Sequence, residues 1–141
     1  MSKQTVPKKR VRQPKRVKSP LRVYVAGPLS ANTAEQLDKN IEVADEAAKA
    51  LFLMGHWPFC PHTQSRTWHN DEREEFHDYE MLVDHHDIDG WLSICDAVLF
   101  LPGWKKSKGS VMEYRAAKEH GKMRFFSVDK IPEIVGWKEA H

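Results

Sequence analysis

Residues 97–113 read AVLFLPGWKKSKGSVME and contain the clearest buried strand of the sequence. Five apolar residues come first and the Pro-Gly pair at 102–103 ends them, which is typical of a short buried strand. A polar loop that contains Gly109 follows, and a helix is predicted from about Val111 to His120. A buried strand, a loop and a helix in this order form the repeating unit of a parallel α/β sheet.

The same unit recurs along the chain. Strands are predicted at 22–26, 56–61, 97–101 and 124–128, and helices at 32–54, 76–94 and 111–120. We expect Asn32 to cap the first helix, with Glu35 behind it in a capping box. The alternation predicts one Rossmann-like (flavodoxin-like) α/β domain, with a mostly parallel sheet of four to five strands and helices on both faces. The polar segment 62–75 is predicted to be a long loop, and long loops in small domains are often functional.

Positive charge is concentrated before the first predicted strand. Nine Lys or Arg and no acid lie between Lys3 and Arg22, although the formal net charge of the chain is only +2. Such a segment cannot offset its ordering entropy, so we predict a disordered basic tail over 1–21 and the α/β domain over 22–141. A solubilising tail would explain this charge. So would weak contact with nucleic acid, or a nuclear-import signal in PKKRVR.

The cysteines and the hydropathy favour a cytoplasmic protein. Cys60 and Cys95 each lie in an apolar stretch and are predicted to be buried free thiols, which favours a reducing compartment. No C-x-x-C pair is present, which argues against a cysteine zinc site. No apolar run approaches the roughly 20 residues that span a membrane, and the charged N-terminus lacks the apolar stretch of a secretory signal.

Ligands of open α/β sheets bind beyond the carboxyl ends of the strands, where the strand order reverses. Two loops are expected there: Gly27-Pro28-Leu29-Ser30, and the loop from Pro102 to Glu113. In the second loop Ser107, Gly109 and Ser110 precede or open a helix, where free amides and the helix dipole favour an anion.

Glu113 is expected in the first turn of that helix, where the dipole stabilises an ionised carboxylate. An ionised carboxylate beside a cleft suits a glycosidic nucleophile. Ser110-x-x-Glu113 is equally a plain capping box that requires no catalysis.

Other candidate residues are acids, histidines and a tyrosine. A buried Tyr24 would require a partner for its hydroxyl, such as a carboxylate, unless it is simply a core residue. Asp87 and Asp89 are two residues apart and do not share a helix face, so they do not form a metal pair. His85 and His86 lack the i+4 partner of a metalloprotease helix. We therefore expect neither a metal nor another cofactor.

Two motifs resemble a known superfamily. RVYVAGPLSAN (22–32) and HHDIDGWLSICDAVLFLPGWKKSKGSVMEYRAA (85–117) are similar to the nucleoside 2-deoxyribosyltransferase-like superfamily, and the resemblance extends over 22–128. The nearest pattern is that of small bacterial and phage members with Y-[IV]-A-G-P and L-P-G-W-x-x-S-x-G-x-x-x-E. The resemblance implies cleavage of the N-glycosidic bond of a 2′-deoxynucleoside or of its 5′-monophosphate.

The resemblance also implies roles for catalytic residues. Glu113 matches the nucleophile that forms a glycosyl-enzyme intermediate, and Tyr24 matches a tyrosine beside it. The acid that handles the leaving base falls at Asp87 or Asp89. Relatives place it eight residues before the aspartate that opens the third strand, and here Ile88 occupies that position. Asp87 is preferred because a basic residue precedes it, as in relatives.

Further matches concern substrate binding. Ser107 matches a serine that binds the 5′-phosphate in monophosphate hydrolases, which favours a deoxynucleotide substrate and water as acceptor. Gly27, Pro28 and Ser30 would line the sugar-phosphate side, and Gly109 would let the backbone approach closely. Trp104 or Trp68 could stack on the base, although each is as compatible with packing. Members are typically dimers or larger, so a homo-oligomer is implied, and the apolar residues at 135–137 are compatible with one.

Three other functions remain open, and a fourth is disfavoured. The chain could exchange bases as a deoxyribosyltransferase, or bind nucleotides without turnover, with Glu113 as a helix cap. It could also be a nucleic-acid-binding protein led by its basic tail. A phosphoribohydrolase of the lysine-decarboxylase-like fold is disfavoured, because P-G-G-x-G-T-x-x-E is absent at Pro102-Gly103-Trp104-Lys105.

Overall fold

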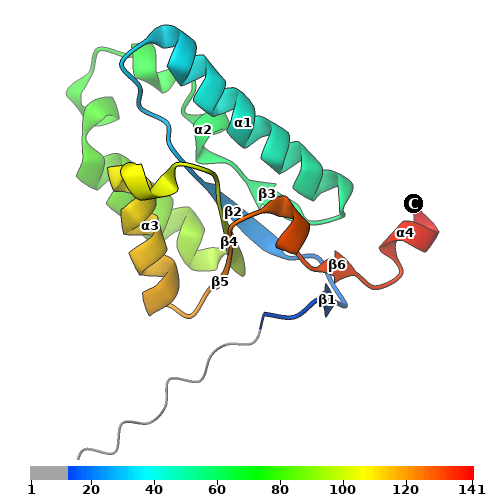
Figure 1. Ribbon diagram of the computed structural model, residues 1–141. Helices are drawn as coiled ribbons and strands as arrows, with labels where there is room; N and C mark the ends of the chain where they lie inside the picture. The colour runs from blue at the N-terminus through cyan, green and yellow to red at the C-terminus, as the bar shows by residue number, and fades with distance from the viewer. Residues whose placement is uncertain (1–12) are drawn as a thin grey trace, which may run out of the picture.

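The computed structural model describes residues 13–141, so most of the predicted basic tail lies outside the described residues. A four-stranded parallel sheet forms the centre of the molecule (Figure 1), in the order β3-β2-β4-β5. The strands are β2 (Arg22–Ala26), β3 (Trp57–Phe59), β4 (Ala97–Phe100) and β5 (Met123–Phe125). The predicted single α/β domain with a parallel sheet is confirmed.

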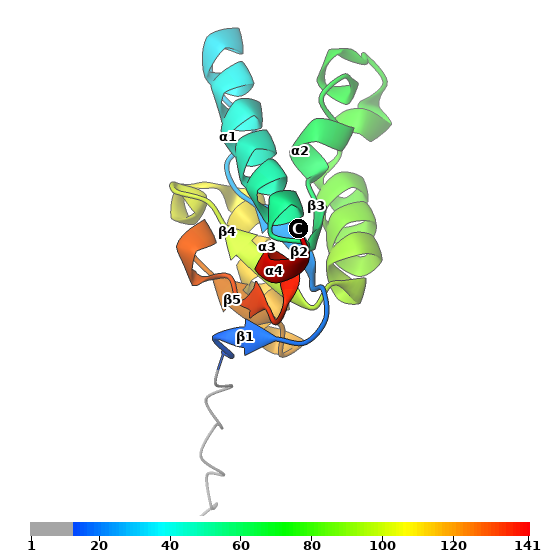
Figure 2. The ribbon, with the colours of Figure 1, turned by 90° about the vertical axis from the view of Figure 1, so that its right-hand side faces the viewer.

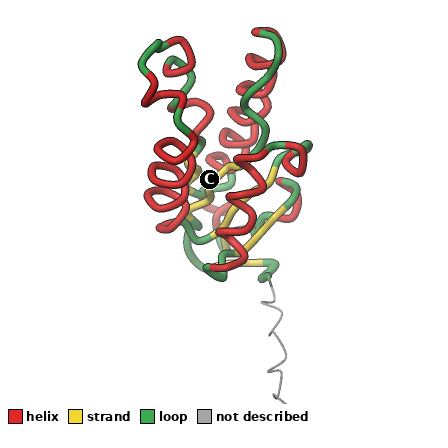
Figure 3. Tube along the Cα trace, turned by 90° about the vertical axis from the view of Figure 1, so that its left-hand side faces the viewer, coloured by secondary structure: helices red, strands yellow, loops and turns green. Residues whose placement is uncertain are grey.

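Helices cover both faces of this sheet because alternate strand residues point to opposite sides. Val23 and Val25 pack with α1 (Ala34–Leu53) and the segment after β5. On the other face, Tyr24 and the remaining inward residues pack with η3 (Glu80–Leu92) and α3 (Lys108–Glu119). Figures 2 and 3 show that α1 and the chain from α2 (Pro61–Gln64) to η3 extend past the sheet on the same side of the molecule.

The strand order reverses between β2 and β4. The strand that follows β2 in the chain, β3, pairs with one edge of β2, whereas β4 pairs with its other edge. The chain therefore leaves β2 toward one face of the sheet and β4 toward the other face. A crevice is expected beyond the carboxyl ends of these two strands. The loops after β2 and β4 border this crevice.

Several predicted boundaries are wrong, and the local chemistry explains why. Thr33, not Asn32, caps α1, because its hydroxyl oxygen accepts a hydrogen bond from the Gln36 amide at 3.1 Å. The strand predicted to end at residue 61 is shorter, because Pro61 begins α2 in the first-turn position that suits proline.

The region predicted as a loop and then one helix contains several short helices. After α2 come η1 (Trp68–Asn70) and η2 (Glu74–His77), both 3₁₀-helices, and then η3, which is a π-helix. The Asp78 carboxylate accepts a hydrogen bond from the Glu80 amide at 2.9 Å and so starts a new helix at this point. The continuous helix predicted over 76–94 is therefore interrupted.

Residues before 22, where we placed the domain boundary, take part in the fold. β1 (Arg16–Val17) pairs in parallel with β6 (Glu133–Ile134). His56 connects the same region: its Nδ1 accepts from the Leu21 amide at 3.0 Å, and its Nε2 donates to the Pro132 carbonyl at 2.7 Å. Residues 16–21 thus belong to the folded domain and not to a tail.

The C-terminal segment packs on its own domain. It includes η5 (Val128–Lys130) and α4 (Trp137–Ala140). The Trp137 indole donates a hydrogen bond to the Leu53 carbonyl at 3.1 Å, and its ring lies where a side chain at Gly55 would otherwise be. Over residues 13–141, no helix combines the length and the apolar character that crossing a membrane demands.

Candidate functional site

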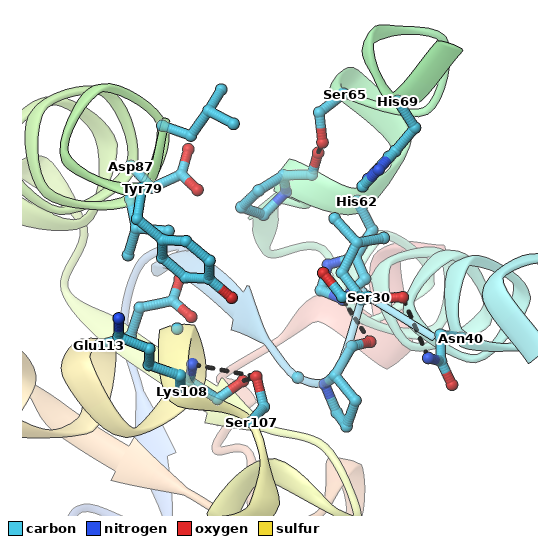
Figure 4. A pocket seen from close by; sticks show the side chains of 18 of the residues that line it. Ser30, Asn40, His62, Ser65, His69, Tyr79, Asp87, Ser107, Lys108 and Glu113 are labelled. Atoms are coloured by element: carbon cyan, nitrogen blue, oxygen red, sulfur yellow. Dashed lines mark hydrogen bonds between the residues drawn. The ribbon is translucent and has the colours of Figure 1, made fainter. Parts of the chain in front are cut away.

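A pocket of about 710 Å³ lies at the carboxyl ends of β2 and β4. Its lining comes from the loops after these strands, from α1 and α2 on one wall, and from η3 and the start of α3 on the other. Figure 4 shows Ser30, Asn40 and His62 across the pocket from Asp87 and Glu113. The position is the one that the strand order predicts.

The two loops at the base of the pocket pack against each other. A side chain on Gly27 would place its Cβ 2.8 Å from the Cβ of Leu101, so only glycine fits without a shift. Gly103 has a φ of +86°, and a Cβ there would lie 3.2 Å from Pro28. The side-chain amide of Asn40 donates a hydrogen bond to the Leu29 carbonyl at 3.1 Å, which fixes the first loop to α1.

His62 fixes the same loop from α2. Its Nε2 lies 2.9 Å from the Pro28 carbonyl oxygen, which can only accept, so this nitrogen carries the proton. Burial lowers the pKa of His62, which keeps the imidazole neutral at neutral pH. Its Nδ1 is buried without a hydrogen-bond partner among residues 13–141.

The start of α3 forms an anion-favouring end of the pocket. Ser107 is the N-cap, and its Oγ accepts from the Ser110 amide at 3.3 Å. Helical geometry leaves the amides of Lys108 and Gly109 without an intrahelical acceptor, and the helix dipole adds positive potential. Lys106 and Lys108 also line the pocket.

The capping-box interpretation of Ser110-x-x-Glu113 is wrong. Ser107 caps the helix, which begins at Lys108 and not at residue 111, so Glu113 lies in its second turn. The glutamate is 7% exposed and lines the inner end of the pocket. Its position therefore has no capping function.

Burial dominates the electrostatics of Glu113. Desolvation raises its pKa to about 8, the neighbouring Tyr24 hydroxyl opposes the rise, and the negative charge of Asp87 adds to it. Our expectation that the helix start stabilises the ionised form is wrong, because the side chain lies past the first turn, where the dipole effect falls off.

Tyr24 lies beneath the pocket, fully buried in β2. Burial raises the pKa of its phenol well above 10, and the charges of Glu113 and Asp87 raise it further. Its hydroxyl has no partner at standard hydrogen-bond geometry among the described residues. Because it keeps its proton beside the Glu113 carboxyl, it is placed to donate to an ionised Glu113.

Of the two candidate aspartates, Asp87 lines the pocket and Asp89 is exposed outside it. Residues three and four apart lie on one face of a helix. The face that lines the pocket has this spacing, and it consists of Tyr79, Leu82, Val83, His86 and Asp87.

Asp87 is paired with its neighbour in the chain. His86 Nδ1 lies 2.8 Å from an Asp87 carboxylate oxygen. Burial raises the pKa of Asp87, and His86 opposes this rise. Asp87 is thus a carboxyl group poised to hold a proton more tightly than a solvated aspartate does.

An aromatic region forms the outer part of the pocket. Trp68 and Phe76 line it, with ring centroids 5.5 Å apart, and Trp68 meets the His86 ring edge-on at 5.7 Å. Trp104 instead stacks on Tyr114 at 4.7 Å, away from this pocket. Within residues 13–141, no three or more His, Cys, Asp or Glu side chains are grouped so that they could hold a metal ion.

Comparison with protein families gives a match over most of the folded chain. A family model described as a domain of unknown function, DUF4406, matches residues 21–125. The chain belongs to the DUF4406 family. A search of curated proteins found no match.

The matched region of this DUF4406 protein includes every residue that lines the pocket. The pocket is lined by Asp87 and Glu113 together with the six residues predicted from the sequence to lie near a ligand, namely Gly27, Pro28, Ser30, Ser107, Gly109 and Ser110. Trp104 was also predicted to contact the ligand, but it does not line this pocket.

Other pocket residues of the DUF4406 protein were missed. They include Asn40, His62, His69, Phe76 and Tyr79. His62 follows a short strand that ends in proline, and this position at a carboxyl strand end could have indicated it. The rest lie on helices whose orientation the sequence does not reveal.

Proposed function

We propose that this DUF4406 protein is an N-glycosidase that cleaves 2′-deoxynucleoside 5′-monophosphates with Glu113 as nucleophile. The observation that supports it most is the placement of two partly desolvated carboxyl groups, Glu113 and Asp87, in one pocket that also contains an anion-favouring helix start. Two carboxyl groups with separate environments suit a nucleophile and a general acid. The resemblance to deoxyribosyltransferase-like proteins points to the same reaction.

In the first step, a Glu113 carboxylate oxygen attacks C1′ as the C1′–N bond breaks. The bonding electron pair goes to the base nitrogen, and Asp87 donates a proton to the leaving base. In the second step, water attacks C1′, Asp87 takes the proton of the water, and the Glu113 carboxylate leaves. The net reaction converts the nucleotide and water into 2-deoxyribose 5-phosphate and a free base.

Glu113 must be ionised for this attack, although burial raises its pKa to about 8. Positive charge that develops at C1′ favours the ionised form, and a hydrogen bond from Tyr24 would stabilise it. A poorly solvated carboxylate is also ready to react without first losing water. Burial thus disfavours the ionised carboxylate of Glu113 in the absence of substrate and makes that carboxylate more reactive once it forms.

The start of α3 provides the phosphate end of the site. Ser107 accepts from the Ser110 amide, and its own hydroxyl proton is free to donate to a phosphate oxygen. The amides of Lys108 and Gly109 and the charge of Lys106 and Lys108 favour the same group. Trp68 and Phe76 form an aromatic surface for the base, on the wall that includes Asp87.

The proposal is tested by measuring release of free base from a panel of deoxynucleosides and their 5′-monophosphates, with and without an added base. We expect release from monophosphates in water. Release that occurs only when an acceptor base is added would indicate a deoxyribosyltransferase instead of a hydrolase. Tight binding without any release would indicate a nucleotide sensor.

Ser107→Ala tests the phosphate end in the same assay. Removing a hydrogen bond to a charged group typically costs about 1.5–3 kcal/mol, so KM for a monophosphate should rise about tenfold or more while KM for the nucleoside changes little. Ser65→Ala is the matched control, because Ser65 lines the opposite wall and donates to the Pro61 carbonyl at 2.7 Å. An equal rise in KM for the nucleoside and the nucleotide would show that Ser107 does not bind the phosphate.

A further inference from the structure

Two shallow grooves meet at Phe126, and most of their lining residues lie outside the candidate active site. The first, of about 440 Å³, is lined by Lys15, Arg124, Lys130 and Phe126 among others. The second, of about 300 Å³, is lined by Phe126, Trp104, Lys105 and Lys106 among others. We call the two grooves together the basic track. Figure 2 shows β1, β5, the segment after β5 and the turn after β4 along one side of the molecule. The residues that line the two grooves belong to these segments or directly adjoin them.

The basic track has one sign of charge. Five cationic side chains line it, and none of its described lining residues is acidic. The Arg124 guanidinium is held in place, because it donates to the Tyr114 hydroxyl at 3.1 Å and lies 5.3 Å from the Tyr114 ring. Positive charge in a groove favours a chain of phosphates.

Aromatic rings alternate with these cations. Phe126 is 51% exposed and stacks on the buried Phe100, with ring centroids 5.7 Å apart. Trp104 lies 5.8 Å from Phe126, and the Lys105 ammonium lies 5.9 Å from the Trp104 ring. A half-exposed ring that is fixed from beneath offers a platform on which a nucleobase can stack.

The basic track is continuous with two other features. The second groove shares Pro102, Gly103 and Lys106 with the candidate active site. At the other end, the Arg124 amide donates to the Gln13 side chain at 2.7 Å, so the chain that follows the basic N-terminal sequence lies beside β5. That sequence adds five cations and no acid between residues 3 and 12.

We propose that the basic track binds single-stranded nucleic acid, with phosphates on its lysines and Arg124 and a base stacked on Phe126. A single strand is favoured over a duplex because only unpaired bases expose a face to the ring. This inference does not depend on the proposed glycosidase, since Phe126, Arg124 and Lys130, which carry it, lie outside the pocket.

The test is fluorescence anisotropy of the full chain with a labelled oligothymidylate and, separately, with a duplex of the same length, over a range of salt concentrations. We expect tighter binding of the single strand. Lys130→Gln should flatten the dependence of log K on log salt by about 0.7 if it removes one phosphate contact. Lys39→Gln, which removes the same charge from the exposed face of α1, should leave the slope unchanged.

The aromatic contact has its own pair of variants. Phe126→Ala should weaken single-strand binding by about fivefold to a hundredfold, the range for loss of one base stack, whereas Phe126→Trp should retain it. Thermal unfolding confirms that both variants fold. Equal affinity for duplex and single strand, no effect of Phe126→Ala, or equal effects of Lys39→Gln and Lys130→Gln would each overturn the proposal.

Discussion

Glu113 shows how a single residue can be placed against its own electrostatic preference. A carboxyl group that is 7% exposed has lost most of its hydration, and this raises its pKa to about 8. A structural glutamate would be expected to gain an ion pair in return for such burial. Instead its neighbours are Tyr24 and another acid, Asp87. Acids with strongly shifted pKa values of this kind cluster at functional sites, which supports the proposed nucleophile.

This burial predicts a pH-dependent stability difference between the wild type and Glu113→Gln. The carboxyl has a usual pKa of 4.5 when the chain is unfolded and about 8 when it is folded. Between these values the unfolded state releases a proton that the folded state keeps, so the wild type loses stability as pH rises, by at most about 1.4 kcal/mol per pH unit. Glutamine does not titrate, and the Tm advantage of the variant should grow from about pH 4.5 to 8 and then level off.

Thermal unfolding at several pH values measures this difference, with Glu42→Gln on the exposed side of α1 as the control. The control should show a Tm difference from the wild type that barely changes with pH. A pH-independent difference for Glu113→Gln would mean that the carboxyl is not desolvated as described.

At the scale of elements, capping and helix type explain most of what the sequence could not reveal. The strands at 22–26 and 97–101 were predicted nearly to the residue, because apolar runs that end in Gly or Pro are unambiguous. The start of α3 was not, since Ser107 and Ser110 both fit an N-cap and only the backbone selects Ser107. The π-helical hydrogen bonding of η3 leaves no clear sequence signal. The sequence also does not reveal which face of this helix points into the pocket, and so it left Asp87 and Asp89 as alternatives.

A side chain would meet different surroundings at two glycines of the pocket, Gly27 and Gly109. We therefore expect substitution by alanine to affect protein stability differently at the two positions. At Gly27 a Cβ would lie 2.8 Å from Leu101, so Gly27→Ala should lower stability by about 1–3 kcal/mol through overpacking of the two loops. At Gly109 a Cβ would lie 3.7 Å from Val83 and 3.8 Å from Tyr79, which is ordinary contact.

Gly109→Ala should therefore keep or slightly raise Tm, because alanine favours a helix. It should raise KM for a monophosphate several-fold, because the added methyl group takes up space beside the anion-favouring amides. Thermal unfolding and base-release kinetics on both variants check the pair. A destabilised Gly109→Ala with unchanged KM would contradict this division between packing and binding.

At the scale of the whole molecule, the alternation of strands and helices was enough to locate the site. Parallel strands place all carboxyl ends at one edge, and the order β3-β2-β4-β5 places the loops after β2 and β4 side by side. The part of the wall formed by α2, η1 and η2 was not predicted, because the polar sequence at 62–75 shows no periodicity from which an orientation follows. Trp68 and Phe76 reach the pocket through that wall, whereas Trp104 packs beyond it.

The proposed mechanism requires that Glu113 forms a covalent bond to the sugar. To test this, the whole protein is mixed rapidly with a monophosphate from which it has been shown to release the base. The reaction is quenched with acid, and the peptides are analysed by mass spectrometry. We expect a peptide containing Glu113 that is heavier by one deoxyribose phosphate in the wild type, and neither adduct nor base release in Glu113→Gln. Base release that continues undiminished in Glu113→Gln would show that Glu113 is not the nucleophile.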